Sequence, residues 1–192
     1  MKAWWQHYRS NLTPDECAAV VDYAQAFPEK QGAIGHGGTQ TEHPMRCRTV
    51  RWLPRHDLHL RWLFDRIILN ALEVNQHTFG LELSDAPRLR FQHAQFTTYD
   101  AGDSGHYDWH EDNCWLSDMS HDRKLTCCIQ LTDPAAYDGG RLELERDNPP
   151  PHLFAQPGDM IFFPSHLRHR VTDVTRGTRH SLVLWFEGPR LR

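Results

Sequence analysis

The stretch at residues 105–113 reads GHYDWHEDN and contains the pattern His-x-Asp twice, as His106/Asp108 and as His110/Asp112. Residues two apart in a β-strand project to the same face, so either copy could offer an imidazole and a carboxylate to one metal ion. A third histidine from another strand would complete a two-histidine, one-carboxylate triad. That donor set is typical of non-haem Fe(II) sites that keep open coordination positions.

Strand alternation cannot choose between the two copies, because positions 106, 108, 110 and 112 would all share one face. Their place along the strand is more informative, since ligand sites in small barrels lie at the mouth. Asp112 opens into a long polar loop that ends around residue 123. His110 and Asp112 are therefore expected to be the ligands rather than His106 and Asp108.

The third ligand is expected from a later strand, and two histidines are candidates. His166 follows directly on the turn-forming Pro164-Ser165, whereas His169 begins a run that reads as a strand. We favour His169.

Arg179 and Ser181 follow an expected turn at Arg176-Gly177 and would share one strand face. A guanidinium and a hydroxyl so placed could clamp a carboxylate near the metal. A buried arginine needs an anionic partner to offset its desolvation, so this pair predicts an acidic co-ligand. The alternative is that Arg179 merely pairs with Glu143 or Glu145.

Two helices are expected in the N-terminal third. Thr13, Pro14 and Glu16 form a helix start with a capping box, and the apolar spacing that follows predicts a helix ending near Phe27. Residues 31–47 read as a loop. The expected elements after it are a strand at 49–53 and a helix at about 57–79 that Gly80 ends.

From residue 88 onward the pattern changes to short β-branched or aromatic runs separated by turn residues. The expected strands are 88–99, 105–110, 125–131, 140–145, 160–163, 169–174 and 179–186. Strands at such spacing indicate a sandwich or a barrel.

The bulk properties fit a folded enzyme-sized chain and narrow its partners. The 192 residues suit one domain, and a formal net charge of -4 with scattered arginines gives no reason to expect nucleic acid. Neither a signal peptide nor a membrane span is recognisable, so a cytoplasmic location is expected. Five cysteines without a C-x-x-C spacing indicate reduced thiols, and both a monomer and a homodimer are compatible with the sequence.

The chain resembles the Fe(II)- and 2-oxoglutarate-dependent dioxygenases, and among them the prolyl 4-hydroxylase-like branch, over roughly residues 88–187. The matching motifs are, in order, Tyr99-x-x-Gly102, Tyr107-x-x-His110-x-Asp112, Asp138-Gly139-Gly140-x-Leu142, Pro157-Gly158-Asp159 with Phe163-Pro164-Ser165, and His169-Arg170-Val171 through Arg176-Gly177-x-Arg179 to Trp185. The order and spacing of five separate motifs make the resemblance specific. The interval between Gly102 and Tyr107 is longer than in the compact form of the motif, a departure that bears mainly on Tyr99.

The resemblance implies a fold that is mainly β with N-terminal helices, a double-stranded β-helix (jelly-roll, cupin-like) barrel. Within a single domain of residues 1–192, a helical N-terminal part of about residues 1–87 would support a catalytic barrel of about residues 88–187. The implied cofactors are Fe(II), 2-oxoglutarate as co-substrate, O2, and ascorbate as a reductant.

Carried over residue by residue, the resemblance makes His110, Asp112 and His169 the iron ligands. It makes Arg179 the anchor for the distal carboxylate of 2-oxoglutarate, with Ser181 on the same face. Tyr99 lies where a family tyrosine contacts the co-substrate.

The implied function is hydroxylation of a C–H bond on a prolyl or other residue of a protein or peptide. Asp112 favours hydroxylation over halogenation, because it keeps the carboxylate ligand. The close alternative is a hydroxylase of a free amino acid or another small molecule. A different class would be a cupin-like Zn or Ni isomerase or a non-catalytic metal-binding module. Residues 31–47 and 113–124 are the expected lids, and Trp115 could line a substrate groove.

Overall fold

A computed structural model describes residues 3–31, 46–86, 88–113, 120–150 and 152–190. In chain order the elements are β1 (Gln6–Tyr8), α1 (Pro14–Ala24), β2 (Lys30–Gln31), β3 (Arg46–Cys47), β4 (Thr49–Pro54), α2 (Arg61–Val74), a π-helical turn (Asn75–Phe79), β5 (His93–Asp100), a 3-10 turn (Ala101–Asp103), β6 (His106–His110), β7 (His121–Gln130), a second 3-10 turn (Pro134–Ala136), β8 (Tyr137–Gly139), β9 (Leu142–Leu144), β10 (Met160–Pro164), β11 (His169–Val171) and β12 (Val174–Pro189).

The described strands form two sheets. The large sheet has eight strands in the order β1-β10-β7-β12-β5-β4-β2, with β8 paired to β12, and the small sheet has four in the order β3-β6-β11-β9. All the pairs are antiparallel. The expected mainly-β jelly-roll class is confirmed, in the form of a sandwich of two sheets rather than a closed barrel.

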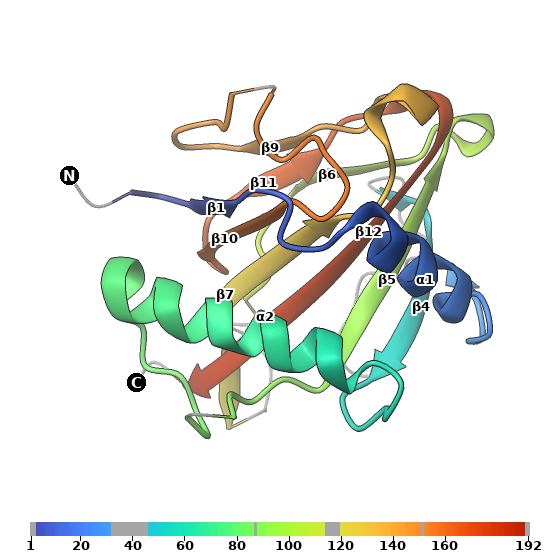
Figure 1. Ribbon diagram of the computed structural model, residues 1–192. Coiled ribbons are helices and arrows are strands. Elements are labelled where there is room, and N and C mark those ends of the chain that lie inside the picture. Colours follow the sequence, from blue (N-terminus) through green and yellow to red (C-terminus); the bar gives the residue numbers. More distant parts are fainter. Residues whose placement is uncertain (1–2, 32–45, 87, 114–119, 151, 191–192) are drawn as a thin grey trace.

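Strand alternation divides the large sheet into an apolar face and a polar face. On β7, Cys127 and Ile129 join Leu182 and Leu184 of β12 in the core cluster that contains the buried residues of both helices. In Figure 1, α2 crosses this face of the sheet. The opposite face looks toward the small sheet and carries mostly polar buried side chains, namely Gln95, Thr97, Tyr99, Thr126, Gln130, Arg179 and Ser181. Buried polar side chains that face a second sheet predict a ligand-binding site between the two sheets.

Helix α1 begins as the sequence predicts. The Thr13 hydroxyl accepts a hydrogen bond from the Glu16 backbone N–H at 3.2 Å, and the Glu16 carboxylate accepts one from the Thr13 N–H at 2.9 Å. This reciprocal capping box pairs two N–H groups that the first helical turn leaves open. The helix ends at Ala24, one turn earlier than expected.

Helix α2 begins later than expected, at Arg61 instead of near Asp57. The Asp57 carboxylate accepts hydrogen bonds from the backbone N–H groups of His59 and Leu60, at 2.9 and 3.3 Å, and so holds residues 57–60 in a turn before the helix. Gly80, with φ +63°, ends the following π-helical turn as predicted.

The expected turn at Arg176-Gly177 is wrong, because β12 runs without interruption from Val174 to Pro189. The chain reverses earlier, between β11 and β12. Gly177 has φ +68° and lies against β8, a strand that the sequence did not reveal, with a register shift in the pairing just before it. Its positive φ therefore marks an irregular position within a strand, not a hairpin turn.

Gly177→Ala is expected to lower the free energy of unfolding by more than Gly80→Ala does. Both positions have a left-handed backbone, which costs a residue with a side chain roughly 1–2 kcal/mol. At Gly177 an added Cβ would also lie 2.1 Å from the Ala136 carbonyl oxygen, whereas at Gly80 nothing lies within 4 Å. Overpacking of this kind adds about 1–3 kcal/mol, which urea unfolding would measure. Equal losses in the two variants would contradict the assignment of a packing role to Gly177.

The N-terminal third also contributes strands to both sheets. β1 pairs with β10 and β4 with β5 in the large sheet, while β3 pairs with β6 in the small sheet. Residues 32–45 of the expected loop at 31–47 lie outside the described residues, as do residues 114–119 of the expected lid at 113–124, Trp115 among them. Residues 121–124 of that lid belong instead to β7. Within the part of the chain that is described, no helix has the length and apolar character needed to cross a membrane.

Candidate metal centre

His110 and His169 meet across neighbouring strands of the small sheet. They are directly opposed in the antiparallel pair of β6 and β11, and their ring centroids lie 4.1 Å apart. Asp112, two residues past the end of β6, completes the cluster. Its Oδ1 lies 3.7 Å from Nε2 of His110 and its Oδ2 lies 3.4 Å from Nε2 of His169.

This cluster has the composition and compactness of a metal centre. One ligand atom from each of the three side chains lies within 4.8 Å of the other two, and Asp112 and His169 are buried. The described residues contain no other group of three or more histidine, cysteine or acidic side chains that meets this criterion. Two imidazoles and one carboxylate on one side of an ion leave further positions open for exogenous ligands.

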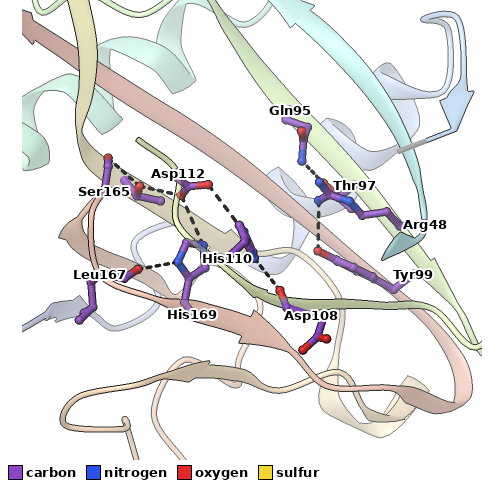
Figure 2. A network of polar contacts seen from close by, with 11 residues as sticks. Arg48, Gln95, Thr97, Tyr99, Asp108, His110, Asp112, Ser165, Leu167 and His169 are labelled. Carbon is purple, nitrogen blue, oxygen red and sulfur yellow. Dashed lines mark hydrogen bonds and ion pairs between the residues drawn. The ribbon is translucent and has the colours of Figure 1, made fainter. Parts of the chain in front are cut away.

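Backbone carbonyls orient both imidazoles. Nδ1 of His110 lies 2.8 Å from the Asp108 carbonyl oxygen, and Nδ1 of His169 lies 2.9 Å from the Leu167 carbonyl oxygen (Figure 2). A carbonyl can only accept, so each Nδ1 donates its proton there and each Nε2 keeps a lone pair. Both lone pairs are thus available to an ion beside Asp112.

The ionisation states of His110 and Asp112 also favour metal binding. Burial, with a smaller electrostatic contribution from His169, lowers the pKa of His110 to about 2, so its imidazole is neutral at physiological pH. Burial opposes ionisation of Asp112, but electrostatic interactions with His169, His110 and Arg123 outweigh the effect of burial and hold the carboxyl pKa below its ordinary value. The centre therefore offers His110 as a neutral donor and Asp112 as an anionic donor.

Hydrogen bonds from the large sheet hold Asp112 in place. Its backbone N–H donates to the Ser165 carbonyl oxygen at 2.9 Å, and its Oδ2 accepts from the Thr126 hydroxyl at 2.9 Å. The Thr126 and Ser165 hydroxyls lie 2.9 Å apart. Neither hydroxyl was anticipated from the sequence, although Thr126 lies on the polar face that alternation along β7 defines.

Thr126→Val is expected to weaken Fe(II) binding about 10- to 100-fold, the usual cost of removing an outer partner of a metal ligand. The substitution keeps the shape of the side chain and removes only the donor to Asp112. Equilibrium binding of Fe(II) under anaerobic conditions would measure the effect. Thr97→Val is the control, because the Thr97 hydroxyl is buried on the same face and accepts instead from Gln95 at 3.0 Å. Indistinguishable affinities for the two variants would contradict the positioning role of Thr126.

The first His-x-Asp copy lies elsewhere. Asp108 is exposed, and Nδ1 of His106 lies 2.7 Å from the Ser104 carbonyl oxygen and 3.8 Å from the Asp173 carboxylate. A register shift between β6 and β11 places Tyr107 opposite Val171 while His110 stays opposite His169. The expectation that positions 106, 108, 110 and 112 all share one face is therefore wrong, because the irregularity turns Tyr107 inward and leaves Asp108 exposed.

Tyr107 belongs to the interior instead. It is buried, and its ring stacks on that of His110, with centroids 3.3 Å apart and an angle of 15° between the planes. The alternative third histidine, His166, is exposed.

Arg179 lies on the same interior face, and no acidic side chain among the described residues pairs with it. It is 3% exposed, its Nε donates to Gln130 Oε1 at 3.0 Å, and its Nη1 is buried with no hydrogen-bond partner among the described residues. The acids considered as alternatives pair elsewhere, Glu143 with Arg170 at 2.7 Å and Glu145 with Arg168 at 2.9 Å. That alternative is therefore wrong, and the guanidinium is available to an anionic ligand.

Two neighbours shape the surroundings of Arg179. The Gln130 amide nitrogen donates to the Thr132 carbonyl and the Tyr137 hydroxyl, so its amide oxygen faces Arg179. A Cβ at Gly140 would lie 2.9 Å from Cδ of Arg179, so glycine leaves the room that this side chain occupies. An unsatisfied buried donor of this kind can bind an anionic group.

Tyr99 and Ser181 are both buried near Arg179. Tyr99 is its direct cross-strand partner on β5, with the guanidinium carbon of Arg179 5.5 Å from the ring centroid. Ser181 lies opposite Gln130 and Thr97 on the neighbouring strands. The Tyr99 hydroxyl accepts a hydrogen bond from Nη1 of Arg48 at 3.4 Å. Arg48 is buried, and the sequence did not indicate that it lies at this site.

Residues 94–187 match a family model described as the 2OG-Fe(II) oxygenase superfamily. A PKHD-type hydroxylase of Janthinobacterium sp. (strain Marseille) is 35% identical over 188 residues, which cover 94% of this chain and 77% of that protein. Another PKHD-type hydroxylase, from Herminiimonas arsenicoxydans, is 35% identical over 127 residues, and the match spans about half of its length, 53%.

Solved structures show the same fold at low sequence identity. A Pseudomonas putida prolyl-4-hydroxylase has a TM-score of 0.71 at 20% identity, with 97% of this chain and 94% of that one covered. A prolyl hydroxylase of Trichoplax adhaerens, in complex with a hypoxia inducible factor peptide fragment, has a TM-score of 0.71 at 14% identity, with 95% and 83% covered.

Proposed function

The chain belongs to the 2OG-Fe(II) oxygenase superfamily, and from this premise we propose that it hydroxylates a C–H bond on a prolyl or other residue of a protein or peptide. It is an oxidoreductase of the Fe(II)- and 2-oxoglutarate-dependent dioxygenase class. The proposal rests on the convergence of His110, Asp112 and His169 within 4.8 Å, together with a buried Arg179 that has no acidic partner among the described residues.

In this proposal His110, Asp112 and His169 hold the metal ion. The two imidazoles present Nε2, and the Asp112 carboxylate offsets part of the charge of the ion. Fe(II) with 2-oxoglutarate and O2 supplies an oxidation in which 2-oxoglutarate becomes succinate and CO2 while one oxygen atom enters the substrate. The residues of the chain place the reactants and exclude water from the buried centre.

Arg179 holds the distal carboxylate of 2-oxoglutarate. Its free Nη1 and its Nε, already fixed by Gln130, give the guanidinium one defined orientation. We assign Ser181, two residues further along β12, and Tyr99, across the sheet on β5, to the same binding site. Ascorbate as a reductant is part of the proposal.

A peptide substrate is favoured by the relatives, which include hydroxylases named for prolyl residues, one of them solved with a peptide. A free amino acid or another small molecule is the alternative substrate. Membership of the superfamily speaks against a Zn or Ni isomerase and against a non-catalytic module.

We propose a reducing, cytoplasmic setting for the enzyme. The three cysteines whose side chains are described, Cys17, Cys127 and Cys128, are buried and free. Burial raises the pKa of the Cys17 thiol to about 12, which makes it a poor nucleophile.

The direct test is turnover with labelled O2. The protein is supplied with Fe(II), 2-oxoglutarate, ascorbate and a panel of prolyl peptides and free amino acids, and succinate and oxygen incorporation are measured. Succinate that depends on Fe(II), with label in a peptide product, supports the proposal. Turnover that persists when Zn(II) replaces Fe(II) would contradict it.

A further inference from the structure

A second buried guanidinium, that of Arg48, lies close to the metal centre. Arg48 stands between β3 and β4 and is 7% exposed. Its guanidinium carbon lies 4.1 Å from the centroid of the Tyr107 ring, and that ring stacks on His110. Only the Tyr107 ring therefore separates the Arg48 charge from one of the proposed iron ligands.

The hydrogen bonding of Arg48 is incomplete. Of its five N–H donors, one reaches the Tyr99 hydroxyl at 3.4 Å, and Nε is buried with no partner among the described residues. No carboxylate of the described chain forms an ion pair with it. Arg51, three residues later, is different, because its Nη2 lies 2.6 Å from Glu29. A buried guanidinium without an anion carries a desolvation cost that a bound anion would offset.

Tyr99 links the two unpaired arginines. Its hydroxyl contacts Arg48 and its ring faces Arg179 (Figure 2 shows Arg48 reaching the Tyr99 hydroxyl). The space between the sheets thus contains two buried cations on different sides of one tyrosine. A single anionic group at Arg179 leaves Arg48 unpaired.

A balance of charges at the loaded site indicates that the two arginines bind different anionic groups. With Fe(II) bound, the ion and the two buried guanidiniums carry three more positive charges than the Asp112 carboxylate offsets. Arg123, which also acts on Asp112, is partly exposed, so solvent screens its charge. The two carboxylates of 2-oxoglutarate offset two of the three charges, one at the ion and one at Arg179. One positive charge remains, and Arg48 is the cation to which no part of 2-oxoglutarate is assigned.

We propose that Arg48 binds a carboxylate of the substrate, so that the enzyme acts on an anionic substrate. The inference rests on the proposed function and names the substrate class of that site. The carboxylate is either the α-carboxylate of an amino acid or C-terminal residue, or the side chain of an acidic residue close to the hydroxylated carbon. Both sources present the same planar group to the guanidinium.

The test measures binding of small carboxylates to the protein loaded with Zn(II) and 2-oxoglutarate, by saturation-transfer NMR. Acetate is compared with acetamide as the minimal pair. Acetyl-proline against acetyl-prolinamide then represents the α-carboxylate, and acetyl-Asp-Pro-amide against acetyl-Asn-Pro-amide represents the side chain. The pair of compounds in which the carboxylate binds more tightly than the amide by the larger factor identifies the source of the carboxylate.

In the wild type we expect acetate to bind about 10- to 100-fold more tightly than acetamide, as charge-assisted hydrogen bonds imply. Arg48→Met should remove this preference and Arg48→Lys should retain part of it. Arg51→Met should leave the preference unchanged, because Glu29 already compensates that charge. A preference that is absent from the wild type, or that survives Arg48→Met, would overturn the proposal.

A second readout separates this inference from the proposed function. The charge-transfer band of the anaerobic Fe(II) and 2-oxoglutarate complex should titrate in Arg48→Met as in the wild type. If Arg48→Met weakens 2-oxoglutarate binding as much as Arg179→Met does, Arg48 serves the co-substrate and the proposal is wrong. If the wild type forms no such band, the proposed function itself fails, whatever acetate does.

Discussion

Asp112→Ala is expected to abolish Fe(II)-dependent turnover of 2-oxoglutarate. The substitution removes the only anionic donor of the cluster and leaves His110 and His169 to hold the ion alone. The loss of Fe(II) affinity should exceed the roughly 10- to 100-fold that removal of an outer partner costs a metal site. Succinate release and anaerobic Fe(II) binding measure the two effects.

Asp108→Ala is the matched control for this variant. It deletes the carboxylate of the first His-x-Asp copy, which is exposed and accepts a hydrogen bond from the Trp109 backbone N–H. Fe(II) affinity and turnover should stay close to those of the wild type. An Asp112→Ala enzyme with full hydroxylase activity would contradict the assignment of the metal centre.

Arg179→Met is expected to raise the KM for 2-oxoglutarate while Fe(II) binding stays intact. Truncating one partner of a buried charge pair costs about 2 to 4 kcal/mol, which corresponds to roughly 30- to 700-fold in affinity. Arg176→Met is the control on the same strand, because Arg176 is exposed and pairs with Asp138 at 2.6 Å. A KM for 2-oxoglutarate that changes equally in both variants would contradict the assignment of Arg179 to co-substrate binding.

The stability of Arg179→Met distinguishes a ligand-binding arginine from a structural one. In the absence of ligand, the buried guanidinium has no acidic partner among the described residues, so an apolar side chain of similar length should leave the free energy of unfolding unchanged or raise it. A structural ion pair would give the opposite result. Urea unfolding without 2-oxoglutarate makes this comparison.

The sequence was sufficient to predict that His110, Asp112 and His169 lie together, and the structure brings them into one cluster. The later Arg179 was expected on the interior side, and it is buried on the large sheet. The capping box of α1 and most strands after residue 88 were also predicted. Local patterns carry these signals, because strand alternation and helix caps depend on residues close in sequence.

Features that depend on distant partners were missed. β1 and β3 have only three and two residues and exist because β10 and β6 supply their hydrogen bonds. The irregular pairing of β6 inverted the expected alternation around Tyr107, and strand periodicity gives no sign of it. The Arg176-Gly177 pair is typical of a turn, yet pairing with β8 keeps Gly177 within a strand.

The polar neighbours of the site were also missed, for different reasons. Gln130 was recoverable, since it follows Thr126 by four residues on one face of β7. Arg48 was not, because it stands outside every matching motif and reaches Tyr99 from between two strands.

The metal-centre assignment is tested most directly by an anaerobic titration of the protein with Fe(II) and then 2-oxoglutarate. The readout is the visible charge-transfer band of the chelate, which is followed in the wild type, His106→Ala and His110→Ala. Both histidines lie on β6 and each has Nδ1 near a backbone carbonyl oxygen, so the variants remove similar side chains from one strand. The band should survive His106→Ala and disappear in His110→Ala. A wild type without the band, or a band that disappears only in His106→Ala, would contradict the metal-centre assignment.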